Sequence, residues 1–167
     1  RIIIFSGKQF SGKDTLAGLM LKKMPTFRRY AMGDVIKDTF GKQNGLTYEQ
    51  IEANKAFYRP ALIELGNWGR KQDPDYWLKK IISADGDIFV TDVRMKHEYE
   101  VFKEAGATSI RVEAPRELRA SRGTLVNEND ITETDLDNIT DWNYIVRNDG
   151  TIESLTTKAD ELVKELK

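Results

Sequence analysis

The sequence predicts an α/β protein in three layers, with a parallel β-sheet between two layers of helices. Short runs of β-branched and aromatic residues alternate with longer segments of helical periodicity along the chain. Parallel strands cannot be joined through tight turns, and connections of this length are typical of right-handed helical crossovers. We therefore expect about five parallel strands in one sheet.

The expected strands are short runs rich in Ile, Val, Phe and Tyr, which are residue types that favour a buried, pleated surface. After the second run the spacing changes to a helical one at 33–37. Pro60 and Pro74 suit the first turn of a helix, and Gly106 suits the end of one. We expect strands at 2–5, 27–32, 88–91, 108–113 and 144–146, and helices at 12–24, 46–55, 59–71, 75–83, 96–105, from 115, and 151–166.

A chain of 167 residues, 40% of them hydrophobic, is long enough to bury one core and leaves little room for a second. We expect a single domain over 1–167. Two segments depart from the alternation of strands and helices, a helical insert at about 46–84 and a polar segment at about 116–135. Both are candidate substrate-side elements, and the polar segment is a candidate lid.

The charges of the chain nearly cancel. Lys and Arg number 26 and Asp and Glu number 27, so no overall field favours a nucleic acid polymer or an acidic membrane. The absence of cysteine and the single histidine exclude thiolate chemistry and multi-histidine metal sites. The longest apolar run, 2–5, is far shorter than the ~20 residues that span a bilayer. We expect no membrane partner, a cytoplasmic location, and either a monomer or a homodimer.

A glycine-rich segment with the spacing G-x-x-x-x-G-K follows the first expected strand. It reads Gly7-Lys8-Gln9-Phe10-Ser11-Gly12-Lys13-Asp14-Thr15, with Asp14 where the usual pattern has Ser or Thr. Glycines let backbone N–H groups curl around a β-phosphate, the following helix presents its positive end, and the lysine reaches the outer phosphates. The alternative is a turn with a solvated lysine, but the strand-loop-helix context favours a phosphate-binding loop.

Two carboxylates are candidate metal ligands. Asp14 lies next to the position from which such loops hold Mg²⁺, and Thr15 offers a hydroxyl to an inner phosphate. Asp92 ends the expected strand 88–91, at the sheet edge where ligands bind in open α/β folds. The alternative for Asp92 is a helix-capping role.

Arginines indicate a second anion near the first. Guanidinium groups bind phosphates in a bidentate way and neutralise charge on a transferring phosphoryl group. A phosphate acceptor has a second pKa near ~6 and needs no general base, whereas a hydroxyl acceptor does. No His or Glu stands at an expected strand end as such a base, so a phosphate acceptor is favoured. The arginines concerned are Arg59 and Arg70 in the insert, Arg94 after the third strand, and Arg119 and Arg122 at the polar segment.

These residues resemble those of the P-loop kinases of the nucleoside monophosphate kinase type, in particular phage-type deoxynucleoside monophosphate kinases and animal-type phosphomevalonate kinases. The resemblance runs along nearly the whole chain, and Asp14 is the residue that this group usually carries. The matching segments are 5–8, 11–15, Arg59 with 62–66, Arg70 before 73–77, 92–94 with Glu98 and 106–107, Arg119 with 122–123, 132–133 with Leu136, and 148–151.

The resemblance implies an adenylate-kinase-like P-loop NTPase fold with ATP and Mg²⁺ as donor and a small phosphorylated molecule as acceptor. Together with the residue patterns, it assigns Lys13, Arg119 and Arg122 to catalysis and Asp14 and Asp92 to the metal. The expected ATP-binding residues are Gly7, Lys8, Ser11, Gly12, Lys13, Asp14, Thr15 and Asn148, and the expected acceptor-binding residues are Arg59, Arg70, Arg94 and Lys37.

The expected activity is transfer of the γ-phosphoryl group of ATP to the phosphate of a small monophosphate, with a (deoxy)nucleoside monophosphate as the leading acceptor. Asp130-Ile131 stands where the deoxynucleotide enzymes often have a histidine, so a phosphomevalonate-like acceptor stays open. A kinase that acts on a hydroxyl group is a further alternative. A nucleotide-hydrolysing switch fits less well, because Asn54-Lys55 is followed by Ala56-Phe57 rather than by the guanine-reading x-Asp.

Overall fold

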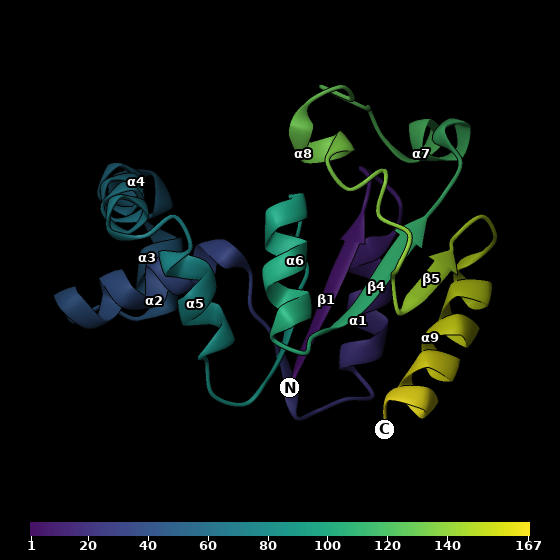
Figure 1. Ribbon diagram of the computed structural model, residues 1–167, viewed down its shortest axis with the longest axis horizontal. Coiled ribbons are helices and arrows are strands. Elements are labelled where there is room, and N and C mark those ends of the chain that lie inside the picture. The colour runs from purple at the N-terminus through teal and green to yellow at the C-terminus, as the bar shows by residue number, and fades with distance from the viewer. The chain divides into compact units, whose positions relative to one another are not determined.

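The computed structural model describes residues 1–167 and confirms the predicted α/β class. It has one five-stranded sheet in which every strand is parallel to its neighbours, in the order β2-β3-β1-β4-β5. Figure 1 shows β1, β4 and β5 side by side. The strands are β1 (Ile2–Gly7), β2 (Phe27–Arg29), β3 (Asp87–Val90), β4 (Thr108–Glu113) and β5 (Tyr144–Arg147).

β1 lies in the middle of the sheet because its side chains are apolar toward both faces. Ile3, Ile4 and Phe5 are fully buried, as a strand covered on both sides requires. Ile4 is in register with Val90 of β3 and with Ser109 of β4. The segments that follow β1, β3 and β4 therefore start along one edge of the sheet, which is where ligands bind in parallel α/β folds.

The core on one face lies between the sheet and two helices, α1 (Lys13–Leu21) and α9 (Ile152–Leu166), which pack against each other. Three aromatic rings anchor this core. The ring centroid of Phe89 lies 4.9 Å from that of Phe5 and 5.0 Å from that of Phe27. α9 begins at Thr151, whose side chain accepts a hydrogen bond from Ser154 N and so caps the helix.

The other face of the sheet carries α6 (Lys96–Glu104), which buries Tyr99 and Phe102. Figure 1 shows α6 and α1 on opposite sides of the sheet, so the predicted three layers are present. The ring of Tyr99 packs at 4.7 Å from that of Trp142, in the segment that leads into β5. Two short helices, α7 (Arg116–Arg122) and α8 (Ile131–Thr134), lie between β4 and β5.

The chain divides into two compact units, one formed by 1–29 with 86–167 and the other by 30–85. The second unit is helical and contains the segment 46–84 that the sequence sets apart. Its helices pack closely where Trp77 Nε1 donates to Gly66 O at 3.0 Å, and a Cβ on Gly69 would lie 2.6 Å from that same nitrogen. The helices of this unit are α2 (Met32–Asn44), α3 (Tyr48–Ala53), α4 (Lys55–Gln72) and α5 (Tyr76–Ile82).

Several element boundaries differ from the prediction. β2 ends at Arg29 rather than at 32, α1 ends at Leu21 rather than at 24, and Pro74 lies before α5, which begins at Tyr76. Pro60 is inside α4 rather than in its first turn, because the helix starts at Lys55. Proline has no N–H, so the helix loses one backbone hydrogen bond there, and packing against α2 and α5 holds the turn in place. The polar segment, for which no helix was expected beyond the one from 115, contains the single turn of α8, which begins where Asp130 accepts from Thr132 N.

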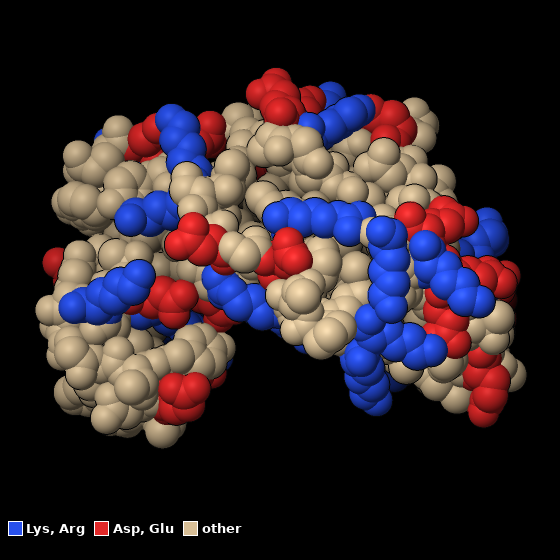
Figure 2. Space-filling model, turned by 90° about the horizontal axis from the view of Figure 1, so that it is seen from below, with Lys and Arg blue, Asp and Glu red and all other residues tan.

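None of the helices has the length and apolar composition that crossing a bilayer would demand. Figure 2 shows acidic and basic side chains interspersed over the face in view.

Replacing Phe89 by Ala is expected to lower the free energy of unfolding by about 3–5 kcal/mol, because it removes the ring between Phe5 and Phe27 and leaves a cavity. The matched control is Ile145→Ala in β5, a side chain that is 53% exposed and should cost within about 0.5 kcal/mol. Urea unfolding measures both. Equal losses in the two variants would contradict the assigned core.

Candidate active site

The glycine-rich loop forms a bend between β1 and α1 that only glycine permits at its last position. Gly12 has φ of 94°, in the left-handed region, and a Cβ there would lie 2.0 Å from Asn148 Nδ2. That same amide nitrogen donates to Ser11 O at 2.9 Å and fixes the loop from the end of β5. Gly12 is therefore required both by backbone conformation and by the close approach of Asn148.

The loop encloses a cavity of about 420 Å³ at the start of α1. The first N–H groups of a helix have no partner within the helix, and they carry the positive end of its dipole. A phosphate in this cavity would meet those groups, as the sequence predicts. The cavity is lined by every residue from Gly7 to Thr15 and by Arg94, Thr124 and Val126.

Lys13 is the most buried cation of the loop cavity, and its side chain is only 10% exposed. Its ammonium donates to Thr91 O at the end of β3 and lies 4.0 Å from Asp14 Oδ1. Burial lowers the pKa of Lys13, while the charges of Asp14 and Asp92 act in the opposite direction. The amine is thus held at the sheet edge by a neutral carbonyl, a partner that a phosphate oxygen can replace with a stronger, charge-assisted bond.

Asp14 and Asp92, the two carboxylates predicted as metal ligands, both lie near Lys13, and their charges act to raise its pKa against the effect of burial. Mg²⁺ takes oxygen ligands and is commonly bound by one or two carboxylates together with substrate phosphates. The donor set therefore fits Mg²⁺ bound with a nucleotide. No cluster of three or more potential ligand side chains is present that would hold a metal without phosphate.

Arg122 donates hydrogen bonds to the loop and to the residue that follows β5. Its NH1 donates to Phe10 O at 3.0 Å and to Ser11 O at 3.3 Å, and its NH2 donates to Asn148 O at 2.7 Å. All three acceptors are neutral carbonyls. Arg122 thus joins the loop to the end of β5, with its charge not paired to a carboxylate in these contacts.

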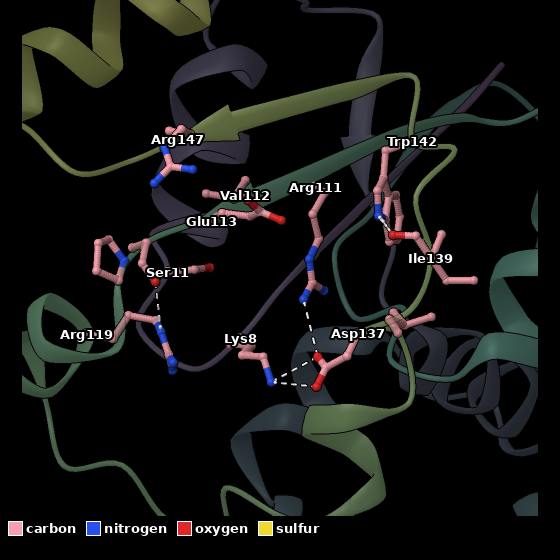
Figure 3. Close-up of a pocket in the computed structure, with 13 residues that line it drawn as sticks. Lys8, Ser11, Arg111, Val112, Glu113, Arg119, Asp137, Ile139, Trp142 and Arg147 are labelled. Carbon is pink, nitrogen blue, oxygen red and sulfur yellow. Dashed lines mark hydrogen bonds and ion pairs between the residues drawn. The ribbon is translucent and has the colours of Figure 1, made fainter.

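Arg119 is buried and lies beneath the loop rather than in the loop cavity. Its Nε donates to Ala114 O at 3.1 Å and its NH1 to Gln9 O at 3.4 Å. Its side chain lines a second cavity, drawn in Figure 3. In this structure Arg119 therefore supports the loop from α7.

The candidate lid is fastened to the loop through Gln9. The Gln9 side-chain amide donates to Val126 O at 2.6 Å and accepts from Val126 N at 3.1 Å, as a neighbouring β-strand would. The backbone N–H of Gln9 donates to Glu133 Oε2 at 3.2 Å. Gln9 thus contacts the lid at two points, one on each side of the turn at Asn127.

Lys8 and Arg94 also contact the segment around α8. Lys8 Nζ donates to Glu133 O at 3.1 Å and forms an ion pair with Asp137 at 3.0 Å. Arg94 NH1 lies 3.8 Å from Glu133 Oε1, and the Arg94 side chain lines the loop cavity. The structure therefore places Arg94, predicted on the acceptor side, beside the phosphate-binding loop.

The other predicted acceptor residues share one cavity within the helical unit. Arg59 and Arg70 of α4 and Lys37 of α2 line a space of about 240 Å³ whose remaining walls are largely apolar. Lys37 forms an ion pair with Glu52 at 2.6 Å. Burial lowers the pKa of Lys37, but the hydrogen bond that it donates to this carboxylate and the charge of Glu52 raise the pKa above its ordinary value. Arg70 donates to Asn67 Oδ1 at 3.2 Å, a neutral partner. The cavity thus combines three cationic side chains with apolar walls.

Three residues of this region were not expected from the sequence alone. Gln9 occupies a variable position of the motif, and its contact with Val126 links residues 117 positions apart. Glu133 is part of the resemblance but had no assigned role. Arg111 is a charged residue within the buried strand β4, and that unusual placement is a signal that the sequence does contain.

Two family models match the chain. One describes phosphomevalonate kinase and matches residues 5–108, and the other describes deoxynucleotide monophosphate kinase and matches residues 61–159. Each match covers more than half of the chain, and both include the part of α4 from residue 61 together with α5, β3 and α6.

Among curated proteins, ORF76 of Ictalurid herpesvirus 1 (strain Auburn), an uncharacterized protein, is 24% identical over 173 residues, which cover 99% of this chain and 68% of that protein. ORF77 of the same virus, also uncharacterized, is 26% identical over 158 residues, with 90% and 64% covered. The chain thus spans about two thirds of the length of these relatives.

Solved structures of similar fold include shikimate kinase from Aquifex aeolicus vf5, with a TM-score of 0.55 and 17% identity over 99% of this chain and 98% of that one. A gluconokinase from Sinorhizobium meliloti 1021 gives a TM-score of 0.55 and 13% identity over 98% and 91%. At these identities the likeness shows the fold alone.

We expect Gln9→Ala to accelerate hydrogen exchange at the Val126 amide about tenfold, because the two side-chain bonds to Val126 contribute about 0.5–1.5 kcal/mol each. Exchange measured by NMR reports this amide directly. The matched control is Gln43→Ala on the exposed side of α2. An unchanged rate at Val126 would show that Gln9 does not hold the lid.

Proposed function

The chain belongs to the P-loop kinase family described by the phosphomevalonate kinase and deoxynucleotide monophosphate kinase models, and from that premise we propose that it transfers the γ-phosphoryl group of ATP to the phosphate of a small monophosphate. The leading acceptor is a (deoxy)nucleoside monophosphate. The observation that carries the proposal is the loop bend at Gly12, which opens a cavity at the start of α1 with Lys13 at its base.

On the donor side, the loop N–H groups and Lys13 bind the β- and γ-phosphates of ATP. Asp14 and Asp92 would hold Mg²⁺, which neutralises phosphate charge and orients the triphosphate when it is bound. Thr15 contacts an inner phosphate. Asn148 acts indirectly on the nucleotide side, since it fixes Ser11 and forbids any side chain at position 12.

On the acceptor side, Arg59, Arg70 and Lys37 bind the acceptor phosphate, while the apolar wall of their cavity takes the rest of the molecule. A phosphate monoester is largely dianionic at neutral pH and attacks without a general base. This chemistry matches a site that is rich in cations. Arg94 lines the loop cavity and adds positive charge beside the phosphates bound there.

Arg119 and Arg122 stabilise charge on the transferring group. Their present partners are carbonyl oxygens, and exchange of such a neutral acceptor for a phosphate oxygen gives a shorter and stronger bond. The lid, tied to the loop through Gln9 and Lys8, excludes water and so suppresses hydrolysis of ATP.

The partners proposed are small phosphorylated molecules rather than nucleic acid polymers or membranes, in a cytoplasmic protein that acts as a monomer or homodimer. Phosphomevalonate is the second candidate acceptor, because the phosphomevalonate kinase model matches residues 5–108.

Lys13→Ala is expected to reduce kcat/KM by at least about 10³-fold, since it removes the cation that stabilises the transferring phosphoryl group. Lys42→Ala, on the exposed part of α2, is the control for loss of one lysine. A coupled assay of ADP release with saturating acceptor measures both. Retained turnover in Lys13→Ala would refute the assigned donor site.

ADP release should rise strongly when the correct acceptor is added from a panel of dAMP, dGMP, dCMP, dTMP, UMP and phosphomevalonate. Arg70→Gln should then raise the acceptor KM about tenfold and leave the KM for ATP unchanged, because Arg70 lines the acceptor cavity and not the loop cavity. Lys71→Gln, the next residue of α4, is the matched control. Slow release that no acceptor accelerates would instead indicate a nucleotide-hydrolysing switch.

A further inference from the structure

A second cavity lies on the other side of the phosphate-binding loop, at the carboxyl ends of β4 and β5. Its volume is about 310 Å³, at the lower end of the ~300–1,000 Å³ typical of small-molecule sites. Lys8 and Ser11 are the residues that it shares with the loop cavity. The proposed phosphoryl transfer uses neither its volume nor its main charged group, Arg111.

Arg111 is a buried cation that shares its one ion-pair partner, Asp137, with Lys8. The residue is only 8% exposed, and its NH1 donates to the neutral hydroxyl of Ser6 at 2.7 Å. The nearest carboxylate, that of Asp137, lies 4.0 Å from NH2 and is held more closely by Lys8, at 3.0 Å. Figure 3 shows the Arg111 and Lys8 side chains both pointing toward this one carboxylate.

Burial of a guanidinium is unfavourable unless its charge is paired and its N–H groups are bonded. Burial accordingly lowers the pKa of Arg111, even though Glu113, Asp137 and Glu133 act in the opposite direction. One shared carboxylate cannot neutralise both Lys8 and Arg111. The cavity therefore carries positive charge that a bound anion would neutralise.

Two further groups point to an occupant. Ser11 lines both this cavity and the loop cavity, and its Oγ is buried and has no hydrogen-bond partner, which is rare for a buried hydroxyl. The guanidinium carbon of Arg111 lies 5.7 Å from the centre of the Trp142 ring, and Leu136 and Ile139 extend the apolar wall beside it. An anion bound at Arg111 would thus have a flat, apolar surface beside it.

We propose that this cavity is a second ligand site, which binds a small organic anion with its phosphate or carboxylate on Arg111 and its apolar body against Trp142. The charges of the lining favour this class, since four cations (Lys8, Arg111, Arg119 and Arg147) face two acids (Glu113 and Asp137). The anchoring residues Arg111 and Trp142 have no part in the proposed phosphoryl transfer, whereas Lys8, Ser11 and Arg119 line this cavity and link it to the phosphate-binding loop.

The test uses the full chain with Mg²⁺ and ADP in excess, so that the phosphate-binding loop is filled, and titrates phenyl phosphate in one arm and inorganic phosphate in the other. The readout is the NMR signal of the Trp142 indole N–H, identified by its loss in Trp142→Phe. We expect a saturable shift with phenyl phosphate. Equal affinity for inorganic phosphate would show that the site takes a bare anion, which contradicts the organic part of the proposal.

Arg111→Met should weaken phenyl phosphate binding at least tenfold and leave the ligand-free Tm unchanged or higher, because an under-paired buried charge is replaced by an apolar chain of similar length. Lys164→Met on α9 removes the same charge far from the cavity lining and should bind like the unaltered chain.

Three results would overturn the proposal. One is the absence of a saturable Trp142 shift in the unaltered chain, and another is an equal shift in Arg111→Met. The third is a clear drop in the Tm of Arg111→Met, which would make Arg111 a structural partner of Asp137. Because the Trp142 signal does not depend on turnover, loss of kinase activity and loss of this site are measured separately.

Discussion

The left-handed bend at Gly12 is the constraint on which the site depends. It lets the chain turn from β1 directly into α1, so that free N–H groups and Lys13 face one cavity. The rest of the sheet supports that bend. Thr91 at the end of β3 holds the Lys13 ammonium, and Asn148 at the end of β5 holds Ser11 and leaves no room for a side chain at position 12. Because the strands are parallel, the loop after β1, Thr91 after β3 and Asn148 after β5 meet at one edge of the sheet and together form the site.

Several cations around the loop donate hydrogen bonds to neutral groups, although Lys13 and Arg111 each also lie 4.0 Å from a carboxylate oxygen. Lys13 and Arg122 donate to carbonyl oxygens, and Arg111 donates to a hydroxyl. A protein optimised only for stability would pair or replace such cations, since buried charge without a counter-ion is unfavourable. A phosphate-binding surface requires cations that can exchange a neutral acceptor for a phosphate oxygen. Lys13, Arg122 and Arg111 are cations of this kind near the loop.

Local pattern was sufficient to predict much of this molecule. The five strands follow from short apolar runs, and the loop follows from glycine spacing, because both depend on neighbouring residues. The contacts of Gln9 with Val126 and of Arg111 with Ser6 join residues more than a hundred positions apart, and no local pattern encodes them. Pro60 misled the prediction of α4, since tertiary packing tolerates a lost helical bond that intrinsic propensity disfavours.

The most direct test of the account is a crystal structure of the chain with Mg²⁺ and a non-hydrolysable ATP analogue. The account predicts the β-phosphate within hydrogen-bond distance of the backbone N–H groups of Gly12 and Lys13, with the Lys13 ammonium moved from Thr91 O to a phosphate oxygen. A nucleotide bound elsewhere, with the loop cavity empty and Lys13 still on Thr91 O, would contradict it.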